Sequence, residues 1–190
     1  MFIQTEATPN PATLKFLPGK VVMDMGTADF RDPMTASAKS PLAAKLFGVD
    51  GVNGVFFGYD FVTVTKEESL DWAHLKPAIL AAIMEHFMAG KPVMASDSVG
   101  DVDDSDESEF FDEGDATIVT TIKELIETRV RPAVAQDGGD ITFKGFKGGT
   151  VYLHMKGACA GCPSSTATLK HGIQNLLHHF IPEVQQVEAV

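Results

Sequence analysis

Cysteines and long apolar stretches are scarce in this sequence. Only two of its 190 residues are cysteines, Cys159 and Cys162, and one closely spaced pair cannot form a framework of structural disulfides. No apolar stretch approaches the roughly 20 residues that a membrane-spanning helix needs. The first residues carry neither a secretory signal nor an Arg-rich presequence. We therefore expect no association with a membrane. We also expect a reducing compartment, with the cytoplasm as the default.

Basic charge is also in short supply. The net charge is −11, from 15 basic and 26 acidic residues. Ten of the acidic residues and none of the basic ones lie between residues 97 and 115, so the rest of the chain is nearly neutral. No stripe of basic residues with interleaved aromatics occurs, and nucleic-acid binding depends on such phosphate contacts. We therefore expect no nucleic-acid partner.

The acidic segment divides the sequence into two parts. A stretch rich in Ser, Asp and Glu buries too little apolar surface to offset its chain entropy, and its like charges repel one another. We interpret residues 95–115 as an acidic flexible linker that serves spacing and solubility. It separates an N-terminal domain at residues 1–94 from a C-terminal domain at residues 116–190.

The N-terminal part has the pattern of a small α+β domain. Ser40 and Pro41 indicate the capped start of a short helix, and a longer helix is predicted from Asp71, with apolar residues every four positions. A hairpin is expected around Gly58. The predicted strands cover residues 2–7, 13–17, 21–25, 51–57 and 61–65.

The C-terminal part predicts the element order αββαβ. A helical stripe of apolar residues ends before Gly138 and Gly139, which permit a chain reversal. A second helix carries Leu169, Ile173 and Leu177 on one face. The predicted strands cover residues 141–146, 151–155 and 184–187. This order is typical of a small α+β sandwich with its helices on one face of the sheet.

The cysteines lie in a loop suited to thiolate chemistry. Two residues separate Cys159 from Cys162, and small neighbours let both sulfurs approach one point. Pro163 predicts that a helix begins directly after the second cysteine. The orphan N–H groups at a helix start lower thiol pKa values and stabilise anions. The loop therefore favours thiolate chemistry, either a metal centre or a disulfide.

One chain cannot complete such a centre with cysteines alone. A tetrahedral zinc ion or a [4Fe–4S] cluster usually takes four protein ligands, and the sequence supplies two thiolates. Two copies related by a twofold axis supply four, and that symmetry is the commonest in protein assemblies. We therefore expect a homodimer that depends on the metal centre.

Other interpretations of the thiol pair remain open at this point. The pair is compatible with incidental thiols, with a thiol-disulfide oxidoreductase and with a zinc-binding adaptor. A hairpin before the loop and Pro163 after it argue against the oxidoreductase.

We interpret the histidines of the C-terminal part as surface or packing residues, because none has ligand spacing from the cysteine pair. No signature of a hydrolase or transferase occurs in the sequence. We expect no enzyme. The four histidines are His154, His171, His178 and His179.

Two sets of motifs resemble a known family. The C-terminal part resembles the C-terminal domain of NifU-like proteins through DGGDI at residues 137–141, GACAGCPSS at 157–165 and LKHGI at 169–173. The N-terminal part resembles the N-terminal domain of the Nfu branch through MFIQT at 1–5, TPNP at 8–11, LKF at 14–16 and FFG at 56–58. Together the two motif sets cover both folded parts, and their order is specific to Nfu proteins.

The resemblance implies an iron–sulfur cluster scaffold or carrier. It implies that Cys159 and Cys162 bind a [4Fe–4S] cluster, which the protein accepts from an upstream donor and delivers to apo-proteins. It also implies that the N-terminal domain contributes partner contacts and no catalysis. The scaffold domain of the U type and its cysteines are absent, so no assembly of clusters from sulfur and iron is expected. The start at Met1 favours a bacterial cytoplasmic protein, with a processed form in the mitochondrial matrix as the alternative.

Overall fold

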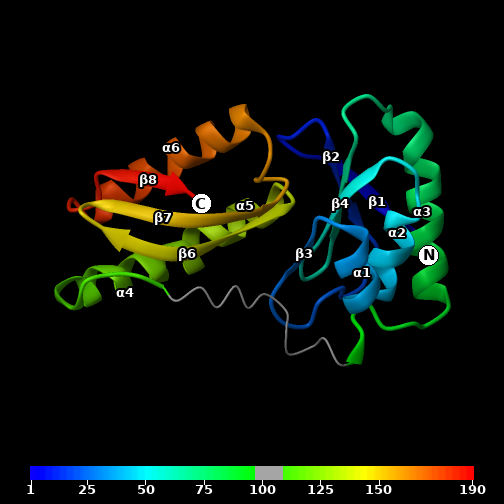
Figure 1. Ribbon diagram of the computed structural model, residues 1–190, viewed down its shortest axis with the longest axis horizontal. Helices are drawn as coiled ribbons and strands as arrows, with labels where there is room; N and C mark the ends of the chain where they lie inside the picture. The colour runs from blue at the N-terminus through cyan, green and yellow to red at the C-terminus, as the bar shows by residue number, and fades with distance from the viewer. Residues whose placement is uncertain (97–108) are drawn as a thin grey trace. The chain divides into compact units, whose positions relative to one another are not determined.

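The chain folds into two compact units, Met1–Asp103 and Asp104–Val190. The computed structural model describes residues 1–96 and 109–190, and each unit is an α+β domain with its own sheet and its own hydrophobic core (Figure 1). The predicted two-domain α+β organisation is therefore confirmed. Most of the predicted linker lies outside the described residues, and the domain boundaries at residues 94 and 116 stay predictions.

The N-terminal unit contains an antiparallel five-stranded sheet with the order β1-β2-β5-β4-β3. Its helices pack against one face of this sheet, because buried residues of all three helices share one core with the strands. The strands are β1 (Gln4–Ala7), β2 (Thr13–Leu17), β3 (Ala28–Phe30), β4 (Val52–Phe57) and β5 (Val62–Lys66), and the helices are α1 (Pro33–Lys39), α2 (Pro41–Phe47) and α3 (Trp72–Met88).

Three elements of the N-terminal unit differ from the sequence prediction, and one of them is β3 (Ala28–Phe30), which was not predicted. The strand expected at residues 21–25 is a loop, because the N–H groups of Val22 and Met23 both donate to the carbonyl of Tyr59 and form no ladder. The helix α1 was not predicted, although Asp32 caps it by accepting the Thr35 N–H at 2.8 Å. The predicted cap at Ser40 is confirmed, since its Oγ accepts the Ala43 N–H at 3.0 Å.

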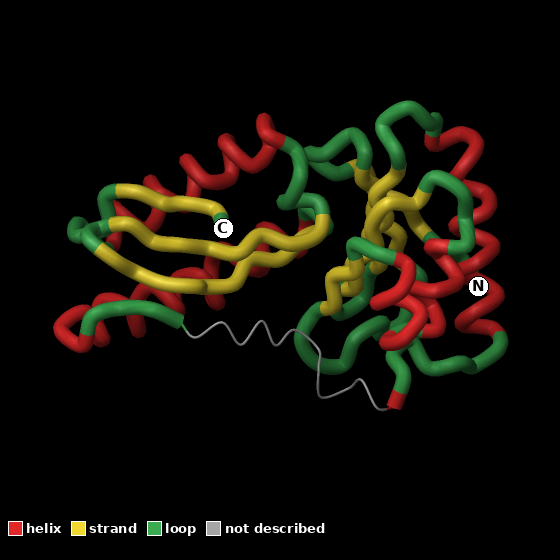
Figure 2. The backbone as a smooth tube through the Cα atoms, in the orientation of Figure 1, coloured by secondary structure: helices red, strands yellow, loops and turns green. Residues whose placement is uncertain are grey.

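The C-terminal unit has the predicted order αββαβ, with a sheet in the order β6-β7-β8 (Figure 2). Strands β6 and β7 are antiparallel, and β8 is parallel to β7. The elements are α4 (Ala116–Leu125), a π-helical turn (Ile126–Val130), α5 (Arg131–Gln136), β6 (Gly139–Lys147), β7 (Thr150–Gly157), α6 (Pro163–Phe180) and β8 (Gln186–Ala189), preceded by a 3-10 turn (Glu113–Asp115).

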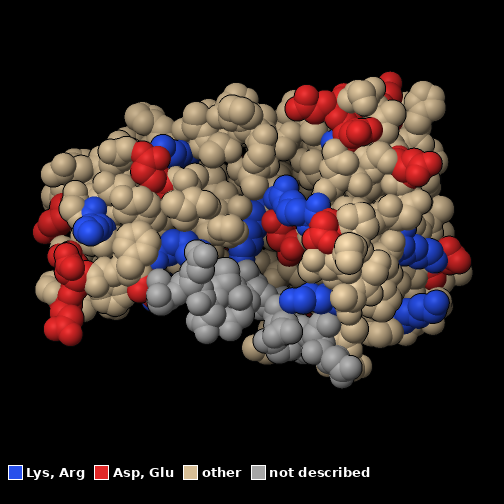
Figure 3. Space-filling model, viewed as in Figure 1, with Lys and Arg blue, Asp and Glu red and all other residues tan. Residues whose placement is uncertain are grey.

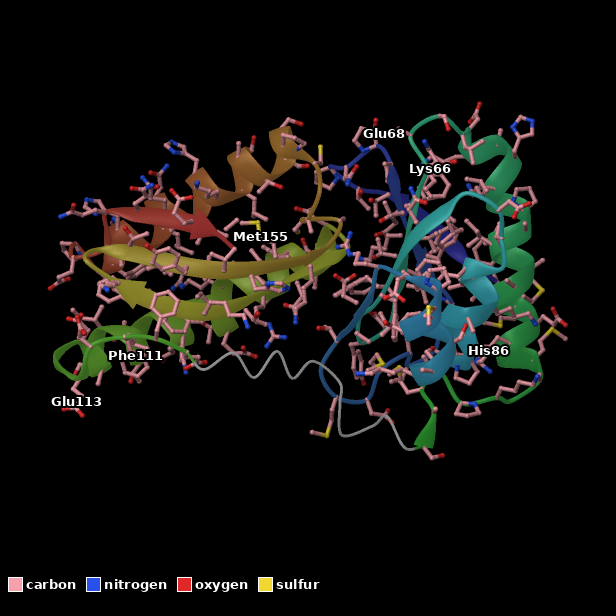
Figure 4. The ribbon with its side chains drawn as sticks, in the orientation of Figure 1. Lys66, Glu68, His86, Phe111, Glu113 and Met155 are labelled. Atoms are coloured by element: carbon pink, nitrogen blue, oxygen red, sulfur yellow. The ribbon has the colours of Figure 1, made fainter. Side chains whose placement is uncertain are left out.

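Alternation along β7 determines which face of the C-terminal sheet the helices cover. Val151, Leu153 and Met155 are buried in one core with residues of α4 and α6 (Figure 4 labels Met155). Tyr152 and His154 alternate with them along the strand and are only partly buried. Both helices therefore lie on one face of the sheet, as predicted. The arrangement leaves the end of β7, where the cysteine loop begins, next to the start of α6.

The described segment before α4 contacts the sheet of its own unit. Phe110 pairs with Gly145 in β6, although the sequence placed residues up to 115 in the linker. Basic and acidic side chains both occur on the face shown in Figure 3, often next to each other, as expected for two nearly neutral folded parts. No helix in residues 1–96 and 109–190 has the length and apolar character required to span a membrane.

A buried histidine in α3 predicts a pH-dependent stability of the N-terminal unit. His86 is 1% exposed, and its Nε2 has no hydrogen-bond partner among the described residues. Burial lowers the pKa of His86 below its usual value because the charged ring loses hydration. The unfolded chain binds a proton near pH 6.5 whereas the folded chain resists it, so stability is present above about pH 6.5 and is lost as the pH falls.

We expect His86→Leu to lose less stability than the wild-type protein between about pH 7.5 and pH 5.5. Urea unfolding followed by the fluorescence of Trp72 measures this, because Trp72 is the single tryptophan and begins the same helix. His74→Ala is the matched control, since His74 is an exposed residue of α3. Equal pH dependence in wild type and His86→Leu would contradict this assignment.

Candidate functional site

The cysteine loop joins β7 to α6 in the C-terminal unit. Gly157 ends β7, and Gly161 is the second of the two residues between the cysteines; both glycines have positive φ, of 64° and 87°. These values are accessible to glycine at no steric cost, so the chain can turn twice within five residues. Cys162 is the N-cap residue of α6 and Pro163 is its first helical residue, as predicted. The two thiols therefore flank a tight turn at a helix start.

Cys159 is held in a buried position by a close approach to β6. It is 5% exposed, and a Cβ atom on Gly139 would lie 2.6 Å from its Sγ and 2.6 Å from the carbonyl oxygen of Lys156. Only glycine leaves this space free. The Ala158 N–H donates to the carbonyl of Gly138 at 3.1 Å, and this hydrogen bond fixes the cysteine loop against the start of β6.

The second half of the loop is fixed by the first turn of α6. The Thr166 hydroxyl donates to the carbonyl of Cys159 at 2.9 Å, and the Thr166 N–H donates to the carbonyl of Cys162 at 2.9 Å. One threonine thus ties both cysteine backbones to the helix. The sequence analysis did not assign a role to Thr166; its place four residues after Cys162 in a predicted helix start is the available signal.

The two thiols have different acidities. The pKa of Cys162 is lowered to about 7 by hydrogen bonding to Ser164 and Ser165, and its Sγ lies 3.4 Å from the Ser164 hydroxyl. The pKa of Cys159 is raised to about 12, chiefly by burial and further by the carboxylates of Asp137 and Asp140. The expectation that the helix start favours both thiolates is therefore correct for Cys162 and wrong for Cys159 in the metal-free chain.

The described residues of one chain offer no complete metal site. Residues 1–96 and 109–190 contain no cluster of three or more His, Cys, Asp or Glu side chains that could hold a metal ion. The ring of His178 instead lies against the chain after α6, with Nδ1 2.7 Å from the carbonyl oxygen of Val184. Cys159 and Cys162 remain the candidate ligands, without a third one from the described part of the chain.

A charged network supports the strand next to Cys159. Asp140 is almost fully buried, with a side chain 5% exposed, and Arg131 contacts it through Nε–Oδ1 and Nη2–Oδ2 distances of 2.8 Å each. Arg131 also binds Glu127 at 2.8 Å, and the Asp140 Oδ1 accepts the Ile141 N–H at 2.8 Å. Asp140 first, and then Glu127, raise the pKa of Arg131 further above its usual range.

The sequence analysis assigned no partner to Asp140. Arg131 follows the π-helical turn Ile126–Val130, where the helix carries an extra residue within one turn. A strict 3.6-residue period does not reveal such a turn, so the position of Arg131 relative to β6 could not be derived from helical spacing. The bidentate pair fixes the start of β6 directly beside Gly139 and hence beside Cys159.

The two units match two family models. The model described as the N terminus of scaffold protein Nfu/NifU matches residues 3–90, and the model of the NifU-like domain matches residues 122–188. Fold and motifs thus define a chain that joins an Nfu N-terminal domain to a NifU-like domain. The protein belongs to the Nfu family, which confirms the resemblance found in the sequence.

Similar proteins are known from animals and plants. The chain is 51% identical to the human protein named NFU1 iron-sulfur cluster scaffold homolog, mitochondrial, over all of this chain and 72% of that one. It is 50% identical to NifU-like protein 4, mitochondrial, of Arabidopsis thaliana, over 99% of this chain and 65% of that protein. A solution structure of a NifU-like protein from Saccharomyces cerevisiae has 26% identity and a TM-score of 0.46, over 50% of this chain and 86% of that one.

The difference in acidity predicts an order of thiol alkylation. At pH 7.5 Cys162 is largely thiolate, because its pKa is about 7, whereas Cys159, with a pKa of about 12, is protonated and buried. We expect iodoacetamide to modify Cys162 at least about tenfold faster in reduced, metal-free protein. Peptide mass spectrometry over time measures both rates. Equal rates, or faster modification of Cys159, would contradict the geometry of the loop.

The buried ion pair predicts a large cost when one partner is removed. Arg131→Met leaves Asp140 buried without its cation, and we expect the C-terminal unit to lose about 3 kcal/mol of unfolding free energy. The double variant Arg131→Met, Asp140→Asn should recover much of this loss because no unpaired charge remains. Urea unfolding followed by the methyl NMR signals of Ile141 measures both. An unchanged stability of Arg131→Met would contradict the role of the pair.

Proposed function

We propose that the protein is a non-enzymatic iron–sulfur carrier. Cys159 and Cys162 of two subunits bind one [4Fe–4S] cluster as cargo, and the homodimer delivers it to apo-proteins. The observation that carries this proposal is the incomplete ligand set: the chain has two cysteines, and its described residues form no group of three metal-ligating side chains. The name of the human relative, an iron-sulfur cluster scaffold, supports the same cargo.

Twofold symmetry makes the shared site chemically consistent. A [4Fe–4S] cluster takes four thiolates, and a self-complementary contact between two loops supplies them in two equal pairs. The helix start at Cys162 offers free backbone N–H groups and a positive dipole end toward the anionic cluster. A site at a seam between two subunits has solvent nearby, which favours release of the cargo.

The unequal thiols suggest the order of the transfer steps. Cys159 must lose its proton when the cluster binds, so loading is coupled to proton release. Cys162 is more accessible and is the better leaving thiolate at neutral pH. A thiol of the client therefore replaces Cys162 first: it binds the iron, and its proton goes to the departing Cys162 sulfur. Cys159 holds the cluster until the second exchange.

The alternatives predict different behaviour of the same thiols. A thiol-disulfide oxidoreductase predicts disulfide reductase turnover in metal-free protein, and a zinc-binding adaptor predicts zinc after purification and no cluster transfer. Neither gains support from the names of the relatives. The carrier function remains the one favoured by the family and by the ligand set.

The partners and the compartment belong to the same proposal. We place apo iron–sulfur proteins downstream and a cluster donor upstream, and assign partner contacts to the N-terminal unit. The chain spans 72% of the human relative and 65% of the Arabidopsis relative, and both are named as mitochondrial. These names support the mitochondrial matrix as the compartment. The bacterial cytoplasm expected from the sequence gains no support from them.

Reconstitution under anaerobic conditions tests the shared site. Ferrous iron and sulfide should give a brown protein with about four irons per dimer. Cys159→Ser and Cys162→Ser should each abolish stable cluster binding but leave the circular dichroism of the metal-free protein unchanged. His171→Ala is the matched control and should load normally. Measurements are iron and sulfide analysis, visible absorption and sizing. A monomer with full cluster occupancy would contradict the proposal.

A further inference from the structure

Thr166, in the first turn of α6, contacts the main chain of both cysteines. Its N–H donates to the carbonyl of Cys162 at 2.9 Å, which is the ordinary hydrogen bond between helical residues four positions apart. Its hydroxyl donates to the carbonyl of Cys159, also at 2.9 Å but seven positions back. The hydroxyl bond is therefore the one that the helix does not require. It ties the first cysteine to the helix that follows the loop (Figure 1).

Other threonines in the helices of this unit use their hydroxyls differently. Thr120 and Thr121 donate to the carbonyls four residues back, at 2.8 and 3.1 Å. Thr168, two residues after Thr166, donates in the same way to the carbonyl of Ser164 at 3.0 Å. Such bonds stay within one helix and are common for threonine. Thr166 departs from this local pattern, because its hydroxyl reaches out of the helix to the cysteine loop.

The turn between the cysteines is not held by packing at its glycine. A Cβ atom on Gly161 would meet no heavy atom within 4 Å beyond its chain neighbours. The N–H of Ala160 donates to the carbonyl of Gly157 at 3.2 Å, and this bond stays within the loop. The Thr166 hydroxyl therefore supplies a connection across the turn. Because the bond ends on the Cys159 carbonyl, it restrains the main chain of the buried cysteine.

The two cysteines differ in what must move when their sulfurs are displaced. Cys162 is partly exposed, and its Sγ lies 3.4 Å from the Ser164 hydroxyl in an exposed contact, so its side chain can rotate without disturbing the core. Cys159 is 5% exposed and belongs to the hydrophobic core of the unit. Displacement of Cys159 thus requires movement of the loop, which the Thr166 hydroxyl opposes.

We propose that Thr166 is a positioning residue that keeps Cys159 bound to the iron–sulfur cluster while Cys162 exchanges. This inference rests on the proposed carrier function. Each exchange breaks one bond between iron and a cysteine sulfur and forms one bond between that iron and the sulfur of an incoming thiol. The proton of the incoming thiol passes to the departing sulfur, so no electrons are transferred. A fixed loop permits the first exchange at Cys162 and delays the second at Cys159.

Thr166→Val tests the restraint in full-length, reduced, metal-free protein. Valine has the shape of threonine but no hydroxyl, so the bond to the Cys159 carbonyl is lost. We expect iodoacetamide to modify Cys159 about fivefold faster, the factor that one hydrogen bond of ordinary strength contributes to a local opening. The rate at Cys162 should stay unchanged, and Thr166→Ser should restore the wild-type rate at Cys159. Peptide mass spectrometry over time measures both rates.

Thr168→Val is the matched control. It removes the next threonine hydroxyl of the same helix, whose bond ends on Ser164 and not on a cysteine. We expect wild-type modification rates at both cysteines in this variant. Each valine variant loses one hydroxyl hydrogen bond, so urea unfolding should show similar losses of stability. A difference at Cys159 then reports the place of the lost bond and not a general loosening of the domain.

Loaded protein tests the order of exchange. After anaerobic reconstitution, 2-mercaptoethanol serves as the incoming thiol, and native mass spectrometry counts the chains and the added thiols on each cluster. The wild type should accumulate a species in which both chains still hold the cluster and added thiols have replaced the Cys162 ligands. In Thr166→Val this species should form at an unchanged rate and lose its chains about fivefold faster. Thr168→Val should match the wild type.

Two results overturn the proposal. Equal modification of Cys159 in Thr166→Val and Thr168→Val shows that the hydroxyl does not restrain this cysteine. Simultaneous loss of both cysteine ligands in the loaded wild type shows that Cys159 is not retained. Neither result removes the cluster as the cargo. The carrier proposal fails separately, and the retention role with it, if wild-type protein remains colourless and monomeric with ferrous iron and sulfide under argon.

Discussion

The close approach between Gly139 and Cys159 is the constraint on which the site depends. The space that a side chain at Gly139 would fill is occupied by the Cys159 sulfur and the Lys156 carbonyl. The chain that follows β7 can therefore lie over Gly139, the first residue of β6, which pairs with Gly157 in β7. The buried Arg131–Asp140 pair then fixes the start of β6 against the helix before it. The site thus follows from the packing of the hairpin.

The same packing separates the chemistry of the two cysteines. The approach to Gly139 buries Cys159 beside two carboxylates, and the N-cap position leaves Cys162 accessible and close to serine hydroxyls. A symmetric spacing in sequence thus becomes an asymmetric pair in space. The asymmetry suits the proposed carrier function, in which one thiolate would exchange while the other retains the cluster. Equal thiols would leave the order of exchange undetermined.

Much of the architecture could be predicted from the sequence, because alternation and helical spacing report which faces are buried. The αββαβ order, the Ser40 cap and the loop before α6 follow from such local rules. Several features did not follow, and three of them show why. The segment at residues 21–25 is apolar but bonds to Tyr59, the Arg131 partner lies beyond a π-helical turn, and burial of Cys159 depends on Gly139, twenty residues away. Each is a tertiary contact that local patterns do not encode.

Release of a cluster requires that the fold survive without it. The C-terminal core is built mainly from apolar side chains: Ile122, Leu153 and Leu177 are fully buried, and Cys159 belongs to the same cluster. Small domains that depend on a structural metal instead unfold when the metal leaves, since the ligands replace the core. Here the apolar packing and the Arg131–Asp140 pair hold the loop on the hairpin. Under the proposed carrier function, the cluster would therefore leave without the free-energy cost of unfolding the domain.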